Sequence, residues 1–116
     1  MTNISVLGLG AMGQALAARL LQQGHSVTLW NRTAGKAGFL VAQGAREVTS
    51  AADAIASSDL TVICVLDYAA ASSVLDGAAS ALAGRAVVNL TNGTPAQARA
   101  TAERLEADFR RTYRYA

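Results

Sequence analysis

The chain has 116 residues, of which 52% are hydrophobic and 16% are charged. This length suits one domain with a single core, and the composition excludes a disordered chain. Three basic residues, Arg110, Arg111 and Arg114, lie in the last seven positions, and the rest of the chain carries seven basic and eight acidic side chains. The formal charge of +2 therefore indicates no basic face, and we expect no nucleic-acid partner.

Short apolar stretches alternate with stretches of helical periodicity, which is typical of right-handed parallel βαβ units. The expected strands are ISVLGL (4–9), SVTLW (26–30), AREV (45–48), LTVICVL (60–66) and AVVNLT (86–91). The expected helices are 11–23, 34–43, 51–58, 68–82 (divided near Gly77) and 95–107. The sequence thus predicts an α/β fold, a Rossmann-type doubly wound parallel sheet of strand order 3-2-1-4-5, and the alternating tail 113–115 can add a sixth strand at its edge.

The first helix has an apolar face formed by Met12, Ala15, Leu16 and Leu20, which we expect to lie on the sheet. Gly24 follows the helix, where a glycine in the left-handed conformation commonly ends it. This helix therefore has both a predicted buried face and a predicted end.

The segment GLGAMG places Gly8, Gly10 and Gly13 in GxGxxG spacing, directly after a strand and at the start of a helix. In such a motif the first glycine allows a tight turn, the second lets a pyrophosphate approach the backbone, and the third lets the helix pack closely on the strand. The alternative is that the glycines serve only the turn and the packing. The strand–turn–helix context favours dinucleotide binding, and we assign the whole segment to it: Gly8, Leu9, Gly10, Ala11, Met12 and Gly13.

The end of the second strand carries Asn31, Arg32 and Thr33, where NAD-binding sites usually carry an acid for the ribose 2′-OH. An acid would repel a 2′-phosphate, whereas arginine offers it a fixed charge and paired donors. Lys36, one helical turn further on, can add a second cation. The alternative is a solvated loop with ordinary surface charge. The combination after the second strand favours NADP(H) as the cofactor.

Other reactive side chains indicate no further chemistry. Cys64 is the one cysteine, and in its apolar run we interpret it as a core thiol rather than a nucleophile. His25 we interpret as a turn residue on the side of the sheet away from the ligand. We assign no catalytic residue and no metal site. Without a signal peptide or an apolar run long enough to span a bilayer, we expect a cytoplasmic protein with no membrane partner.

Together, GLGAMG, WNRT, CVLDY and NLTNGTP make residues 3–108 resemble the N-terminal domain of imine reductases, in the β-hydroxyacid dehydrogenase and 6-phosphogluconate dehydrogenase-like superfamily. The resemblance implies that the turn Val65, Leu66 and Asp67 passes beside the ribose and nicotinamide, and that Thr91 lies close to the nicotinamide. For Asp67, capping of the following helix is an alternative, and both roles can hold.

The resemblance also implies hydride transfer from NADPH to an imine or related carbonyl carbon of a small-molecule substrate. Its relatives usually continue into a helical domain that supplies the proton donor and forms a homodimer. We therefore divide the chain into an NADP(H)-binding domain (1–108) and an atypical tail (109–116) that we interpret as a truncation or altered frame. We expect a homodimer, and no catalysis by these residues alone. The alternatives are a stand-alone non-catalytic dinucleotide-binding module, a β-hydroxyacid dehydrogenase, or an oligomerisation fragment with an empty site.

Overall fold

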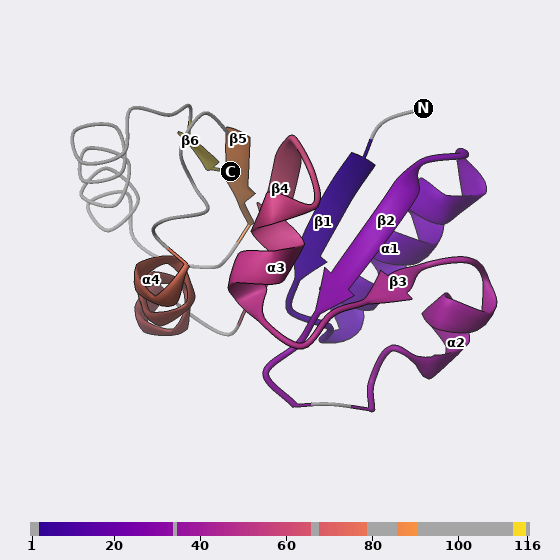
Figure 1. Cartoon of the computed structure of the whole chain (residues 1–116), viewed down its shortest axis with the longest axis horizontal. Coiled ribbons are helices and arrows are strands. Elements are labelled where there is room, and N and C mark those ends of the chain that lie inside the picture. Colours follow the sequence, from indigo (N-terminus) through magenta and orange to yellow (C-terminus); the bar gives the residue numbers. More distant parts are fainter. Residues whose placement is uncertain (1–2, 34, 66–67, 79–85, 91–112, 116) are drawn as a thin grey trace.

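The computed structural model describes residues 3–33, 35–65, 68–78, 86–90 and 113–115. Within them the strands form one parallel sheet (Figure 1). In spatial order the strands are β3 (Arg46–Glu47), β2 (Ser26–Trp30), β1 (Asn3–Leu7), β4 (Leu60–Ile63), β5 (Ala86–Asn89) and β6 (Tyr113–Tyr115). The predicted order 3-2-1-4-5 is confirmed, and the tail adds the sixth strand at the edge beside β5.

Helices cover both faces of the sheet, as the doubly wound prediction requires (Figure 1). Helices α1 (Ala11–Gln22) and α2 (Gly38–Ala42) contribute to one core cluster, and α3 (Ala51–Ala56) and α4 (Tyr68–Gly77) contribute to the other. Because neighbouring strand residues point to opposite faces, Val6 of β1 lies in the α1 cluster and Leu7 in the α3 cluster. Both faces of the central strand are therefore buried.

The buried face of α1 agrees only in part with the predicted one: Leu16 is half-buried and the half-buried Leu20 packs against the core, but the other two predicted residues are exposed. Its buried residues are Gly13 and Ala17, whereas Ala15 is exposed and Met12 is 56% exposed. The helix approaches β1 so closely that only small residues fit in the contact, because a Cβ at Gly13 would overlap the carbonyl group of Gly8. The glycine motif predicted this close approach, whereas the apolar pattern of the helix did not. The predicted end is confirmed, since Gly24 has a φ of 88°.

Two glycines also set element boundaries that differ from the predicted ones. Strand β1 ends at Leu7 rather than position 9, because Gly8 turns the chain with a φ of 100°. Helix α2 begins at Gly38 rather than position 34, because Gly35, with a φ of 92°, interrupts helical geometry. Lys36 therefore lies in a turn and not on a helix. Helix α4 ends at Gly77, where the division was predicted, and the expected helix 95–107 lies outside the described residues.

Hydrogen bonds fix α3 to the sheet and position the start of the helix. Ser50 caps the helix, its hydroxyl accepting from the Asp53 N–H at 3.0 Å. On β1, the buried Ser5 hydroxyl donates to the Ala54 carbonyl and lies 2.8 Å from the Ser58 hydroxyl. The second half of α3 is thereby bonded to the middle of β1, while Ser50 caps its first turn.

The close contact of α1 with β1 can be tested with a pair of glycine variants. Gly13→Ala places a methyl group against the Gly8 carbonyl, so we expect the free energy of unfolding to fall by about 1–3 kcal/mol or more. Gly10→Ala adds a Cβ that meets nothing at an ordinary φ of −70°, so we expect a loss below about 1 kcal/mol. Thermal and urea unfolding followed by circular dichroism measure both. Equal losses in the two variants would contradict the close packing.

Candidate functional site

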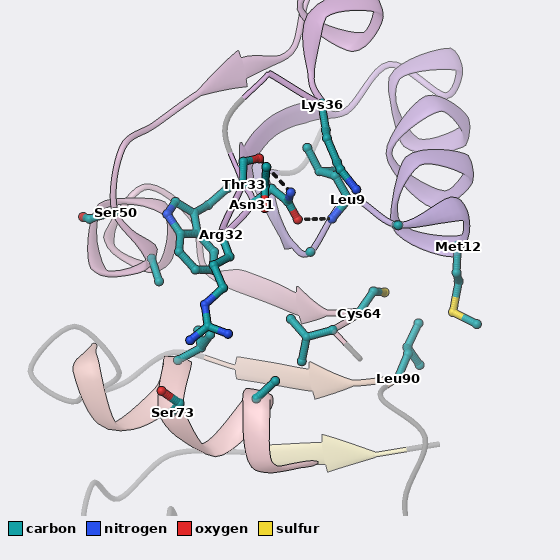
Figure 2. Close-up of a pocket in the computed structure, with 18 of the residues that line it drawn as sticks. Leu9, Met12, Asn31, Arg32, Thr33, Lys36, Ser50, Cys64, Ser73 and Leu90 are labelled. Carbon is teal, nitrogen blue, oxygen red and sulfur yellow. Dashed lines mark hydrogen bonds between the residues drawn. The ribbon is translucent and has the colours of Figure 1, made fainter. Parts of the chain in front are cut away.

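A cleft of about 1000 Å³ opens at the carboxyl end of the sheet, where Gly8 follows β1, Trp30 ends β2 and Cys64 follows β4 (Figure 2). This edge includes the switch point of the sheet, because β2 lies on one side of β1 and β4 on the other. Ligands of open α/β sheets bind at this point. Most of the predicted site residues line the cleft: Gly8, Leu9, Gly10, Ala11, Met12, Gly13, Asn31, Arg32, Thr33, Lys36 and Val65.

The three glycines of the motif have different surroundings. At Gly8 the chain turns with a positive φ, and a Cβ there would overlap the carbonyl group of Cys64. At Gly13 a Cβ would overlap the Gly8 carbonyl, whereas at Gly10 it would meet nothing within 4 Å. Gly8 and Gly13 therefore have the expected turn and packing roles. Gly10 opens onto the cleft. That a pyrophosphate approaches the backbone there stays a prediction.

The amino end of α1 faces this cleft without a side-chain cap. Its N-cap is Gly10, which has no side chain to accept from the first-turn N–H groups. Those N–H groups have no partner within the helix, and they carry the positive end of the helix dipole. The first-turn residues Ala11, Met12 and Gly13 line the cleft. This arrangement favours an anionic group at the start of α1.

Hydrogen bonds join the glycine loop to the turn after β2. The Leu9 N–H donates to Asn31 Oδ1 at 2.8 Å, and Asn31 Nδ2 donates to the Thr33 carbonyl at 2.8 Å (Figure 2). The Gly8 N–H donates to the Trp30 carbonyl at 2.9 Å. The Asn31 amide thus contacts both segments, and the two loops form one side of the cleft.

The described residues that line the cleft include two charged side chains, Arg32 and Lys36, and both are exposed. Figure 2 shows Arg32 extending from the end of β2 toward α4, which carries Ser73, while Lys36 lies on the side of Leu9. No carboxylate is present among these lining residues. The cleft is therefore electropositive over its described part.

Sequence reasoning missed the wall that faces Arg32. It is formed by Thr49, Ser50, Ala51 and Ala52, before and in the first turn of α3, and by Ala70, Ser73 and Val74 of α4. Three further lining residues that the sequence did not indicate lie at or after strand ends: Trp30, Cys64 and Leu90. The available signal was position, since residues directly after each parallel strand share one edge. Three predicted site residues, Leu66, Asp67 and Thr91, lie outside the described residues.

Cys64 and His25 have different positions relative to the cleft. Cys64, predicted as a core thiol rather than a nucleophile, is half-buried and lines the cleft, so it lies at the border of the core and not inside it. Burial raises the pKa of the Cys64 thiol above its ordinary value, which disfavours the thiolate. His25 lies at the amino end of β2, where its backbone N–H donates to the Leu20 carbonyl, consistent with a turn residue.

The described part of the chain contains no cluster of three or more His, Cys, Asp or Glu side chains that could hold a metal ion. None of its helices is long and apolar enough to cross a bilayer.

Comparison with known proteins supports these observations. The family model described as the NAD binding domain of 6-phosphogluconate dehydrogenase matches residues 3–112. An NADPH-dependent reductive aminase of Aspergillus oryzae is 44% identical over 101 residues, which are 87% of this chain and 34% of that protein. An imine reductase from Aspergillus terreus, solved in complex with NADPH4 and dibenz[c,e]azepine, is 48% identical with a TM-score of 0.88, over 99% of this chain and 39% of that one. The resemblance to imine reductases is confirmed.

A third relative has a different kind of name. The human cytokine-like nuclear factor N-PAC is 41% identical over 82 residues, which are 71% of this chain and 15% of that protein. The chain thus spans about a third of the length of the reductive aminase, and less of N-PAC.

The raised pKa of Cys64 predicts low reactivity at neutral pH. Because little of the thiol is ionised, we expect iodoacetamide to alkylate Cys64 several-fold more slowly in the folded chain than in the urea-unfolded chain. The difference between the two alkylation rates should decrease as the pH rises through the raised pKa, because the folded thiol then becomes ionised too. Mass spectrometry of the Cys64 peptide at a series of pH values measures both rates. Equal rates at neutral pH would show that the cleft does not suppress the thiolate.

Proposed function

Because the chain belongs to the family of NAD-binding domains of 6-phosphogluconate dehydrogenase, we propose that it binds NADP(H) in the cleft at the carboxyl end of its sheet. In the complete protein this cofactor supplies the hydride that reduces an imine or related carbonyl carbon. The observation that carries the proposal is an electropositive cleft, with an uncapped helix start and two cations but no carboxylate among its described lining residues.

The pyrophosphate is proposed to lie at the amino end of α1. There the first-turn N–H groups have no helical partner, and Gly10 leaves space for close approach. Gly8 and Gly13 act indirectly. Because they have no Cβ, the turn can lie against the Cys64 backbone and the helix against the Gly8 carbonyl. These residues bind and orient the cofactor, and the redox chemistry belongs to the cofactor itself.

The 2′-phosphate is proposed to lie between Arg32 and the turn that follows it. Arg32 supplies a fixed charge and planar donors, while Thr33 offers a hydroxyl and Lys36 a second charge. All three line the cleft. The nicotinamide end is proposed to lie near Val65, with Leu66, Asp67 and Thr91 as further contacts that the resemblance implies.

The substrate is proposed to be a small imine or a related carbonyl compound. This rests on the relatives named as a reductive aminase and an imine reductase, of which the chain spans 34% and 39%. The homodimer, the cytoplasmic location and the division into residues 1–108 and 109–116 stay part of this proposal. So does the expectation that these 116 residues bind NADPH without rapid imine reduction.

A non-catalytic dinucleotide-binding module is the second candidate, because one relative at 41% identity is named as a nuclear factor rather than as a reductase. The two candidates differ in turnover by the complete protein. NADPH oxidation that depends on an added cyclic imine supports the reductase, whereas tight NADPH binding without oxidation supports the module.

Arg32 provides the sharpest test of the cofactor. Arg32→Ala removes charged hydrogen bonds of about 1.5–3 kcal/mol, so the Kd for NADPH should rise about ten- to a hundredfold. NADH has only a hydroxyl at this position, and its Kd should change little. Arg32→Asp should shift the preference toward NADH, because the carboxylate repels the phosphate and accepts from the ribose hydroxyls. Calorimetric titration with both cofactors measures these constants.

Lys36→Ala is the companion variant, and we expect a smaller loss of NADPH affinity, because the exposed lysine is a flexible point charge. Equal losses for NADPH and NADH in Arg32→Ala, or no loss for either, would refute the 2′-phosphate site.

Gly10→Ala tests the pyrophosphate position. Its Cβ occupies space in the cleft where the backbone is open, and both cofactors carry the same pyrophosphate. We therefore expect the affinities for NADPH and NADH to fall by the same factor, about tenfold or more, with the fold retained. Unchanged binding of both cofactors would contradict this placement.

A further inference from the structure

We propose that Asn31 is a positioning residue for NADPH selectivity: its side-chain amide holds the turn that carries Arg32 against the glycine loop. This inference rests on the proposed function, because it explains how Arg32 comes to face a 2′-phosphate. It differs from the direct cofactor contact that the sequence suggested for Asn31.

Both ends of the Asn31 amide are engaged within the protein. Oδ1 accepts from the Leu9 N–H, and Nδ2 donates to the Thr33 carbonyl, each at 2.8 Å (Figure 2). Asn31 itself is half-buried, while Arg32 and Thr33 are exposed. The amide is therefore the inner bridge between two segments that are 22 residues apart, and the cation projects from the outer side of that bridge.

The bridge changes which groups are available to a ligand. The Leu9 N–H is used by Asn31 and the Gly8 N–H by the Trp30 carbonyl. The backbone donors left for the pyrophosphate are those that begin at Gly10, in the uncapped first turn of α1. Leu9 thus contributes to the site through its place in the loop and not through its N–H.

The bridge also fixes the backbone on both sides of Arg32. Asn31 is bonded to the glycine loop, and the Thr33 carbonyl is bonded to Asn31. An arginine on an unanchored exposed turn would lose more conformational entropy on binding, because both its backbone and its side chain would have to become ordered. With the backbone already ordered, more of the guanidinium–phosphate interaction remains as affinity.

Asparagine suits this position better than the aspartate or glutamate typical of NAD sites. A carboxylate could accept from the Leu9 N–H, but it has no N–H for the Thr33 carbonyl, and its charge would repel a 2′-phosphate. The amide supplies both an acceptor and a donor and stays neutral. The neutral Asn31 amide and the neighbouring Arg32 cation therefore both favour a cofactor with a 2′-phosphate.

Binding by Asn31→Ala, Arg32→Ala and the double variant tests the inference as a double-mutant cycle. We expect Asn31→Ala to weaken NADPH about tenfold and NADH only about two- to threefold, since the glycine loop serves both cofactors and Arg32 only NADPH. In the Arg32→Ala background, the loss of NADPH affinity caused by Asn31→Ala should shrink to the two- to threefold seen with NADH. Calorimetry with both cofactors measures the cycle.

Gln14→Ala is the matched control, because Gln14 Nε2 donates to the Leu9 carbonyl at 2.7 Å. This substitution removes a hydrogen bond from a side-chain amide to the glycine loop, but it removes no hydrogen bond to the turn that carries Arg32. We expect it to change NADPH and NADH affinities by equal factors. Should Asn31→Ala unfold at the assay temperature, Asn31→Ser replaces it, and the same coupling to Arg32 is expected.

The outcomes separate the inference from the proposed function. If Asn31→Ala lowers both affinities equally, as in the control, or if its NADPH loss adds fully to that of Arg32→Ala, then Asn31 is not a positioning residue for Arg32. If Arg32→Ala leaves the ratio of the NADPH and NADH affinities unchanged, the proposed 2′-phosphate site at Arg32 is wrong, irrespective of the result with Asn31→Ala.

Discussion

The close approach of α1 to the sheet is the constraint on which the rest of the structure depends. At Gly8 the chain turns against the Cys64 backbone, and at Gly13 the helix lies against the Gly8 carbonyl. Any side chain at either position would separate the helix from β1 and β4. Because the helix lies so close, its uncapped amino end opens directly onto the switch point of the sheet. The close packing of α1 on the sheet and the position of its anion-attracting amino end thus both depend on Gly8 and Gly13.

The cleft depends on a second, weaker connection between distant segments. The backbone bond from Gly8 to Trp30 and the Asn31 bridge join the glycine loop to the turn after β2. This turn brings the two cations to the cleft, while α3, held by Ser5 and capped by Ser50, forms part of the opposite wall. The charged side is exposed and the wall beside α3 and α4 carries no charged lining residue among those described, so the cleft offers a cationic side to a phosphate and an uncharged side to an apolar group.

The comparisons place this arrangement in a family whose members differ in what they do. Relatives at similar identity are named as a reductive aminase and as a nuclear factor. The matches cover 87% and 71% of this chain but only 34% and 15% of the two relatives, so most of each relative's length lies outside the match. The fold and the cleft therefore indicate the class of cofactor better than they indicate the reaction. The reaction also depends on the groups around the bound ligand, which the fold does not determine.

The sequence by itself determined the strand order and the main segments that line the cleft, because both depend on local patterns. Alternating apolar and helical stretches have one favoured handedness, and GxGxxG after a strand has a known geometry. The glycine segment and residues Asn31 to Thr33 accordingly line the cleft as expected. The close packing of Gly13 also follows from the motif, but only the tertiary structure decided that Ala17 is buried on α1 and Met12 is exposed, since the apolar periodicity predicted the opposite for Met12. It also decided that the Asn31 amide bridges two loops and that Ser73 and Ala52 complete the wall. These contacts join residues far apart in the chain, and no pattern of neighbouring residues records them.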